Sequence, residues 1–309
     1  MTATISLPVP ERAKRRPGRG RAGGSHHAGY LFVSLYVVLL LLFGVAPTAY
    51  ALYLSFTEAG KPWHWAGLSN FLSTGRDFRF VPAFEHIAIY LAIWLTVLVV
   101  LVLFLALMLH GGARRVVPAF RFLFYLPGAL AGSASVIVWV FMFDPELSPW
   151  HFALALFHFS SFPQVIAPGH LPAIFAVIAF WTGAGGWIVV MNGALNNISD
   201  EVIDSARIDG ANAWQLAFRV KLPLIRKWVV YMLILAFAAG TQLIVEPTIV
   251  ASASLGMVSP FWSPNQLAYY LATYNDNFNY AAAIAVDLLF VGLVAAALLV
   301  FRSKLFELE

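Results

Sequence analysis

The sequence contains no cysteine among its 309 residues, and only 11% of its residues are charged. Without cysteine the chain has no disulfide framework, no thiol nucleophile and no cysteine-based metal site. The low charge, together with a hydrophobic content of 61%, excludes an ordinary soluble domain. The 17 prolines and 22 glycines fit what remains, because both residues are commoner in membrane helices than in soluble ones. The composition therefore predicts a protein that crosses the membrane several times.

Sequence motifs for catalysis are also missing. The chain has no G-x4-G-K-[ST] phosphate loop, no H-E-x-x-H helix and no G-x-S-x-G elbow. Its histidines show no spacing typical of a metal site. We therefore expect no ATP hydrolysis, no metal site and no enzymatic activity in this chain, and an intramembrane hydrolase is a remote alternative. Any energy that the protein uses must come from another subunit or from an ion gradient.

Six apolar stretches are long enough to cross a hydrocarbon core, which takes about 20 residues of helix. They predict an all-α membrane protein with six transmembrane helices, at residues 29–57, 86–110, 122–143, 171–195, 228–250 and 281–301. We expect residues 1–28 to be a disordered basic tail, residues 29–305 to form the transmembrane domain and residues 306–309 to be a short C-terminal tail. The lipid bilayer is thus one expected partner.

The basic residues are distributed unevenly between these stretches. Of the 19 Lys and Arg residues, 16 fall in the N-terminal segment, around residues 114–121, in 199–227 and after the last predicted span at 302–304, and three fall in residues 58–85. The positive-inside rule places both termini and the 199–227 loop in the cytoplasm. The same rule explains the net charge of +4 better than nucleic-acid binding does, so we expect no nucleic-acid partner.

The loop at 199–227 is the longest polar segment between two apolar ones. Ser199 can cap a short helix over residues 200–208, which Gly210 ends. Asn212 with Gln215 three residues later predicts a capping box at the start of a second short helix, and we expect Pro223 to end that helix. Two short helices with a glycine bend between them indicate a docking element for a protein outside this chain.

The spacing in this loop resembles a known family. Asp204-Ser205-Ala206, three residues, Gly210, nine residues and Val220-Lys221-Leu222-Pro223 match the EAA loop of ABC importer permeases, E-A-A-x3-G-x9-I-x-L-P. The stretch Ala206-Arg207-Ile208-Asp209-Gly210-Ala211 is similar to the sugar-importing, maltose-type branch. Asp204 and Ser205 depart from the usual Glu and Ala, which shortens the acidic side chain by one methylene. The ATPase-coupling residues that the resemblance implies are Asp204, Ser205, Ala206, Arg207, Asp209, Gly210, Ala211, Leu222 and Pro223.

The resemblance implies a permease subunit of a binding-protein-dependent ABC importer for a sugar or a related polyhydroxylated solute. Its implied partners are a second homologous permease, a dimer of ABC nucleotide-binding subunits and an extracytoplasmic substrate-binding protein. ATP and Mg are expected in the partner ATPase, and no cofactor in this chain. The implied location is the bacterial inner membrane, with several crossings.

Polar residues inside the predicted spans are candidates for a substrate path, because an ionisable side chain at mid-bilayer is costly. Gln242 and Glu246 share one face of a helix at a spacing of four, and Asp287 lies in the last span. Their functional interpretation is hydrogen bonding to sugar hydroxyls. The alternatives are pairing with each other or with a second subunit, and a position near the outer lipid headgroups. Trp181 and Asn192 are weaker candidates, since the small residues between Trp181 and Trp187 predict close helix packing.

A second function class stays open at this point. In an ion-coupled secondary carrier, Glu246 and Asp287 would titrate during transport. Such carriers usually contain internal repeats, and the two halves of this sequence show no convincing self-similarity.

The remaining outer segments differ from the loops on the other side. Residues 144–170 and 251–280 contain no Lys or Arg and are rich in proline and aromatic residues. They predict an outer vestibule that packs on span ends or against a substrate-delivery protein, with anchoring at the lipid headgroups as the alternative.

Overall fold

The computed structural model describes residues 25–110, 117–130 and 132–303. The chain falls into two compact units, residues 1–50 and 51–309. Among the described residues, four helices are long and apolar enough to cross a membrane, and two bent helix pairs raise that number to six if each pair is one span. The predicted helical membrane architecture is thus confirmed at this coarse level. The predicted tails lie mostly outside the described residues.

The first unit is a helix interrupted by one wide turn. Helix α1 (Ser25–Leu40) begins four residues inside the predicted tail and continues through the π turn η1 (Leu41–Val45) into α2 (Ala46–Ser55). The π turn ends two residues before Pro47. A proline has no N–H and its ring clashes with the carbonyl four residues earlier, here Phe43, which lies inside the wide turn. The wide turn lets the helix pass the proline.

Two asparagines hold the chain where it leaves α2. The hairpin β1 (Thr57–Glu58) and β2 (Lys61–Trp65) follows, and then α3 (Ser69–Gly75). Asn70 Nδ2 donates to the carbonyl oxygens of Ser55 and Thr57, each at 2.9 Å. Asn279, at the start of α16 (Phe278–Ser303), donates to the carbonyl of the same Thr57 at 2.9 Å. Both asparagines are buried, so these bonds tie the first third of the chain to its last helix.

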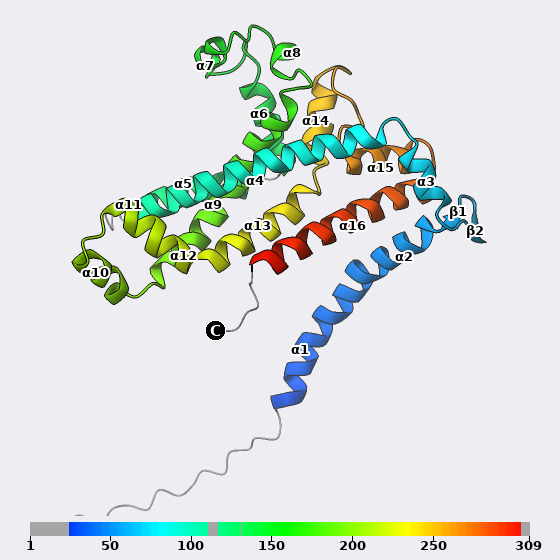
Figure 1. Ribbon diagram of the computed structural model, residues 1–309. Helices are drawn as coiled ribbons and strands as arrows, with labels where there is room; N and C mark the ends of the chain where they lie inside the picture. Colours follow the sequence, from blue (N-terminus) through cyan, green and yellow to red (C-terminus); the bar gives the residue numbers. More distant parts are fainter. Residues whose placement is uncertain (1–24, 111–116, 131, 304–309) are drawn as a thin grey trace, which may run out of the picture. The chain divides into compact units, whose positions relative to one another are not determined.

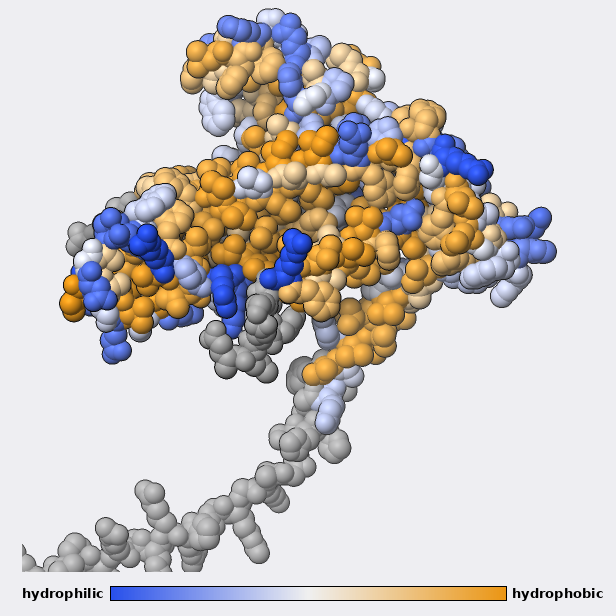
Figure 2. Space-filling model, in the orientation of Figure 1, coloured by the Kyte–Doolittle hydropathy of each residue, from blue (hydrophilic) through white to orange (hydrophobic). Residues whose placement is uncertain are grey.

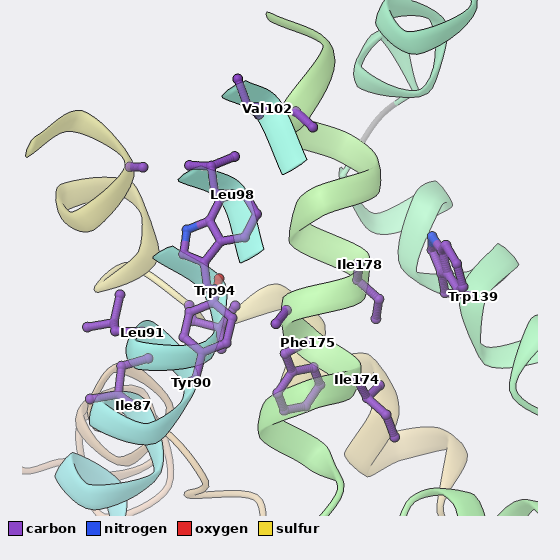
Figure 3. Packing of buried hydrophobic residues seen from close by; sticks show 14 of the residues in the cluster. Ile87, Tyr90, Leu91, Trp94, Leu98, Val102, Trp139, Ile174, Phe175 and Ile178 are labelled. Carbon is purple, nitrogen blue, oxygen red and sulfur yellow. The ribbon is translucent and has the colours of Figure 1, made fainter. Parts of the chain in front are cut away.

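The core of the second unit lies between α4 (Phe80–His110) and α9 (Leu171–Asn196), which run side by side (Figure 1). Buried residues recur on α4 every three or four positions, as one face of a helix requires. They include Ile87, Tyr90, Leu91, Trp94, Leu98 and Val102, which belong to one buried cluster with Ile174, Phe175 and Ile178 of α9 (Figure 3). Helix α4 starts six residues before the predicted span because Phe80 and Phe84 also pack inward, against α15 and α16.

The third predicted span is not one helix. It consists of α5 (Val117–Tyr125), the 3-10 turn η2 (Leu126–Ala129) and α6 (Gly132–Met142), and the two halves are bent by 106°. The expectation of a continuous helix over 122–143 was therefore wrong. Pro127 lies in the tight turn, where its missing N–H and fixed φ favour the end of the α-helix.

The glycines of α9 allow this bent segment to approach closely. A Cβ atom at Gly185 would overlap the carbonyl oxygen of Phe124, and one at Gly128 would lie 2.8 Å from that of Thr182. The backbones of α5, η2 and α9 are thus in direct contact, which confirms the predicted close packing of the small residues after Trp181. The neighbouring Gly186 faces open space.

The rest of the chain completes a bundle around α4 and α9. After α7 (His151–Leu156) and α8 (Phe162–Val165) come α9, α10 (Asp200–Ile208) and a compound helix described below. Helix α13 (Arg226–Gly240) packs on α4 and α16, α14 (Val245–Ala253) packs on α6, and α15 (Pro264–Thr273) packs on α16 (Figure 1). The surface over α4 and α16 is largely hydrophobic, whereas hydrophilic residues gather at the end formed by α10 (Figure 2).

The substitution Gly185→Ala should destabilise the protein. Its Cβ would overlap a backbone oxygen, which cannot rotate away as a side chain can, and overpacking of this kind costs about 1–3 kcal/mol. We expect a lower midpoint of thermal unfolding in detergent. Gly186→Ala is the matched control, because the same change one residue later meets open space. Equal midpoints for the two variants would contradict the close approach.

Candidate functional site

Helix α10 begins the polar loop and is held to the protein mainly by one residue, Ile203, which is 7% exposed. Asp200 and Glu201 lie in the first turn, as expected, where they oppose the positive end of the helix dipole. Ser199 occupies the N-cap position, but its side chain makes no hydrogen bond to the first turn. The predicted capping by Ser199 was therefore wrong.

The end of α10 depends on Gly210, as predicted. The N–H of Gly210 donates to the carbonyl of Arg207, and the N–H of Ala211 donates to that of Ala206, each at 3.0 Å. This pair of bonds is the Schellman motif, which requires a left-handed residue between them. Gly210 supplies it with a φ of +83°. A side chain at this position would be strained whatever space surrounds it.

The outer surface of α10 carries one ion pair and one large apolar side chain. Arg207 donates to the carboxylate of Asp204 at 3.1 Å, and both side chains are 63% exposed. An exposed pair of this kind contributes little stability, so Asp204 can exchange its partner at small cost. The hydroxyl of Ser205 donates to the carbonyl of Glu201 at 2.7 Å. Ile208 is 86% exposed.

The second helix of the loop is longer than predicted. Asn212 and Gln215 form the predicted capping box, with bonds of 2.9 Å in both directions. The helix then continues through α11 (Ala213–Gln215), the π turn η3 (Leu216–Lys221) and α12 (Leu222–Leu224) to a break at Ile225. There it bends by 67° into α13.

Pro223 does not end this helix, contrary to expectation. The carbonyl four residues before it belongs to Arg219, which lies inside the π turn η3. The wide turn thus accommodates the proline ring, in the same way that η1 accommodates Pro47. Leu222 is half-buried and Pro223 exposed.

Two of the substrate-path candidates line one cavity. This inner cavity of about 210 Å³ lies between α4, α9, α13 and α14 and includes Gln242 and Glu246. Tyr90 and Trp94 border it from α4, and Thr182 and Gly183 from α9. The cavity combines two aromatic rings with hydroxyl, amide and carboxyl groups. Such a site can bind a small ligand that has both apolar faces and hydroxyl groups.

Gln242 and Glu246 do not share the face of one helix, however. Helix α13 ends at Gly240 and α14 starts at Val245, so the predicted span over 228–250 is broken at residues 241–244. Pro247 has no N–H to offer the carbonyl of Leu243, which lies four residues earlier. That carbonyl instead accepts a hydrogen bond of 2.7 Å from the hydroxyl of Ser263.

A second side chain supports the same break. Asn265 Nδ2 donates to the carbonyl of Thr241 at 2.8 Å. Ser263 and Asn265 both belong to the start of α15, where Ser263 also forms a capping box with Gln266. The start of α15 therefore provides the donors for two carbonyls that a continuous helix would have paired by itself.

The other predicted path residues lie elsewhere. Trp181 packs edge-on against Trp139 with ring centroids 5.7 Å apart, and Asn192 is buried further along α9. Asp287 lines a separate cavity of about 710 Å³ between α3, α4 and α16. Glu85 lines the same cavity. The structure therefore groups Gln242 with Glu246 and separates both from Trp181, Asn192 and Asp287.

Tyr90, Trp94 and Thr182 are the lining residues that sequence reasoning missed. Tyr90 and Trp94 are spaced by four in a long apolar run, which placed them on one face of a helix but did not show what that face contacts. Thr182 lies in the small-residue stretch that was interpreted as packing. In the described residues no group of three or more His, Asp and Glu side chains is close enough to hold a metal ion.

Comparison with known proteins decides the family. Residues 113–304, more than half of the chain, match the family described as "Binding-protein-dependent transport system inner membrane component". The chain belongs to this family. It is thus a permease component of a binding-protein-dependent transport system and a multi-pass inner membrane protein. The comparisons give no support to the alternative of an ion-coupled carrier.

Individual relatives of this permease cover nearly its whole length. The probable ABC transporter permease protein YesP of Bacillus subtilis is 28% identical over 297 residues, which is 90% of each chain. The arabinooligosaccharides transport system permease protein AraP of the same organism is 26% identical and covers 100% of this chain and 98% of its own. The diacetylchitobiose uptake system permease protein NgcF of Streptomyces coelicolor is 24% identical, with 97% and 92% covered.

A solved structure shares the fold of the permease. A chain of a bacterial ABC transporter that imports the acidic polysaccharide alginate superposes with a TM-score of 0.75 at 18% identity, covering 91% of this chain and 96% of that one. The same transporter has been solved in complex with an alginate pentasaccharide-bound periplasmic protein, with a TM-score of 0.74.

The substitution Ser263→Ala should loosen the break between α13 and α14. It removes the donor to a buried carbonyl, which costs about 1–3 kcal/mol. Hydrogen–deuterium exchange should become faster in residues 241–250, and the unfolding midpoint should fall. Thr273→Ala serves as a control, because that exposed hydroxyl bonds only within α15. Unchanged exchange at 241–250 would show that Ser263 does not hold the break.

Proposed function

We propose that this permease forms half of the pore of an ATP-driven ABC importer for a sugar or a related polyhydroxylated solute. The observation that carries the proposal is the pairing of an exposed helix, α10, in an EAA-type loop with a cavity of hydroxyl, amide, carboxyl and aromatic groups. The names of the relatives support the solute class, since AraP and NgcF are permeases for saccharides.

The proposed topology has six crossings. The four long helices supply four of them, and each bent helix pair supplies one more. The second bent pair ends with α13, and α14 continues that fifth crossing beyond the break. The excess of Lys and Arg places both termini and α10 on the cytoplasmic side. Residues 1–28 remain the proposed cytoplasmic tail, with the first four residues of α1 at its end, residues 29–305 the transmembrane domain and 306–309 the C-terminal tail.

Energy enters through α10. A nucleotide-binding subunit holds ATP and Mg, receives α10 in a surface cleft and moves it when the ATPase dimer closes. Asp204 meets a basic or amide group there, while Gly210, Ala206 and Ala211 allow close approach. Arg207, Asp209 and Ser205 border the contact, and Leu222 and Pro223 connect it to the bend at Ile225.

The motion then reaches the inner cavity along packed elements. Helix α10 contacts η3, and the bend at Ile225 joins that helix to α13. A Cβ at Gly240, the last residue of α13, would lie 2.6 Å from Leu91 and 3.3 Å from Trp94. A shift of α13 therefore displaces Trp94, which lines the inner cavity, and Leu91 on the same helix. The permease is the bistable element, and nucleotide binding biases it between inward-open and outward-open states.

Gln242 and Glu246 bind the solute by accepting hydrogen bonds from its hydroxyls, and the rings of Tyr90 and Trp94 pack on its apolar faces. Trp181, Asn192 and Asp287 line the path when the permease adopts its other conformation. A second homologous permease supplies the other half of the pore, and an extracytoplasmic binding protein delivers the solute.

Variants of α10 test the coupling. Asp204→Lys reverses the charge of the contact, and Gly210→Arg strains the Schellman motif and blocks close approach. In proteoliposomes that contain the permease with its operon partners, both variants should abolish solute uptake while ATP hydrolysis persists. Asp204→Glu and Gly210→Asn are the controls and should retain uptake, because the first restores the residue usual in the family and Asn tolerates a left-handed backbone. Normal uptake by Gly210→Arg would exclude the docking role.

A variant of the inner cavity tests the path. Glu246→Ala removes hydrogen bonds to a charged acceptor, which are worth about 1.5–3 kcal/mol, and should lower the uptake rate about 10- to 100-fold at saturating loaded binding protein. Glu58→Ala, which removes an exposed carboxylate of the hairpin that is not among the proposed path residues, should have less than a tenth of that effect. Equal effects of the two variants on the uptake rate would show that Glu246 does not bind the solute along its path.

The energy source separates the proposal from an ion-coupled carrier. Uptake by this system should stop when ATP is depleted and should persist when an uncoupler collapses the proton gradient. The opposite result would contradict the proposal.

A further inference from the structure

A second cavity lies on the other side of α14. This outer cavity has a volume of about 270 Å³ and is lined by α14, by the turn that follows it and by α15. Three tyrosines of α15 border it, Tyr269, Tyr270 and Tyr274, together with Thr248 and Ser252 of α14. Glu246 faces the inner cavity and Thr248 the outer one, so α14 separates the two.

The three tyrosines present aromatic surface in a fixed arrangement. Tyr270 and Tyr274 stack with their centroids 5.2 Å apart, and Tyr270 meets Phe261 edge-on at 5.5 Å. The guanidinium of Arg79 lies 5.7 Å from the ring of Tyr270 and 5.2 Å from that of Phe261. Arg79 is itself held by Asp77 at 2.6 Å, and the same contact keeps the pKa of Asp77 below its usual value. Contacts with Phe261 and Arg79 therefore hold the ring of Tyr270 in place.

Tyr269 and Tyr274 remain available on the open side, with 55% and 74% of their surfaces exposed. Amphipathic rings of this kind offer an apolar face and a hydroxyl group at once. The hydroxyls of Thr248 and Ser252 donate to carbonyls of their own helix, at 2.6 and 2.9 Å, which leaves Ser252 Oγ with acceptor capacity toward the cavity. Polar groups and rings thus face the same space.

The lining is uncharged. None of its ten residues is Asp, Glu, Lys, Arg or His. A charged ligand would find no partner here, whereas a neutral ligand with apolar ring faces and many hydroxyls would. This combination fits a pyranose or furanose ring rather than an acidic sugar or a metal ion.

The volume of the inner cavity limits how much of a saccharide it can hold. At about 210 Å³ it is smaller than the roughly 300–1,000 Å³ typical of sites for drug-sized ligands. A saccharide of several units cannot be enclosed there whole. In the proposed topology α14 extends outward from the break at 241–244, so the outer cavity lies on the extracytoplasmic side of the inner one.

We propose that the outer cavity is a second saccharide subsite, in which Tyr269 and Tyr274 stack on a sugar unit of a neutral oligosaccharide while its leading unit occupies the inner cavity. This proposal rests on the proposed function, because it takes the solute to be a sugar. It adds that the permease itself selects for chain length.

Uptake of saccharides of different lengths tests the subsite. The complete importer, reconstituted with its operon partners, is given the mono-, di-, tri- and tetrasaccharides of the maltose, arabinose and N-acetylglucosamine series, each at saturating loaded binding protein. The measured quantity is the ratio of the uptake rate of the longest saccharide carried to that of the shortest. Tyr269→Ala and Tyr274→Ala should each lower this ratio about tenfold. Tyr269→Phe and Tyr274→Phe should preserve it, because they keep the ring.

A variant that blocks the outer cavity distinguishes loss of the subsite from loss of folding. Ser252→Trp fills the outer cavity from α14 and should lower the ratio as the alanine variants do, while uptake of the shortest saccharide shows that the complex is intact. Tyr231→Ala, on α13 and away from the cavity, is the matched control and should leave the ratio unchanged.

The outcomes separate the two proposals. If the unmodified importer carries no saccharide of any series, the proposed sugar function fails, and the subsite fails with it. If it carries saccharides and the ratio is unchanged in Tyr269→Ala, Tyr274→Ala and Ser252→Trp, the subsite is wrong and the function stands. An equal loss of uptake at every length would show that the cavity receives the delivery protein rather than sugar, and this too would overturn the proposal.

Discussion

The bond on which the rest of this structure depends is the one from the Ser263 hydroxyl to the carbonyl of Leu243. A backbone carbonyl inside the membrane must have a donor, since hydrocarbon offers none. Pro247 removes the donor that a continuous helix would supply, and α15 replaces it from 20 residues further along the chain. Asn265 does the same for Thr241. The carbonyls of Leu243 and Thr241 at the break between α13 and α14 thus both have hydrogen-bond donors.

This break explains why polar residues can gather here. Because α14 does not continue the direction of α13 (Figure 1), Gln242, which lies within the break, and Glu246, in the first turn of α14, border one cavity. The prolines at 47 and 223 raise the same difficulty and are accommodated within their own helices, by the π turns η1 and η3. Of these three prolines, the one at 247 leaves a carbonyl that is paired from a distant residue, and it is the one beside the cavity.

The features predicted correctly from the sequence are those that depend on residues close together in the chain. Hydropathy located the apolar segments, and the spacing of Gly210 and of Asn212 with Gln215 predicted the turns of the polar loop correctly. The break at 241–244 was missed because Thr, Gln, Leu and Ile are unremarkable in a helix, and its support comes from residues far along the chain. For the same reason, only the packing of α4 on α9 shows that Tyr90 and Trp94 face the cavity. The Ser199 cap failed because a residue type with the right propensity need not turn its side chain to the helix.

The bonds of Asn279 have a consequence for biosynthesis. Thr57 leaves the ribosome more than 200 residues before Asn279, yet its carbonyl accepts a hydrogen bond from that side chain. Asn70, available much earlier, can hold the same carbonyl in the meantime. The exit of the first crossing can therefore be ordered early, but it reaches its final form only once the last helix has been made. A chain truncated before residue 278 would therefore lack the hydrogen bond that joins the last helix to Thr57.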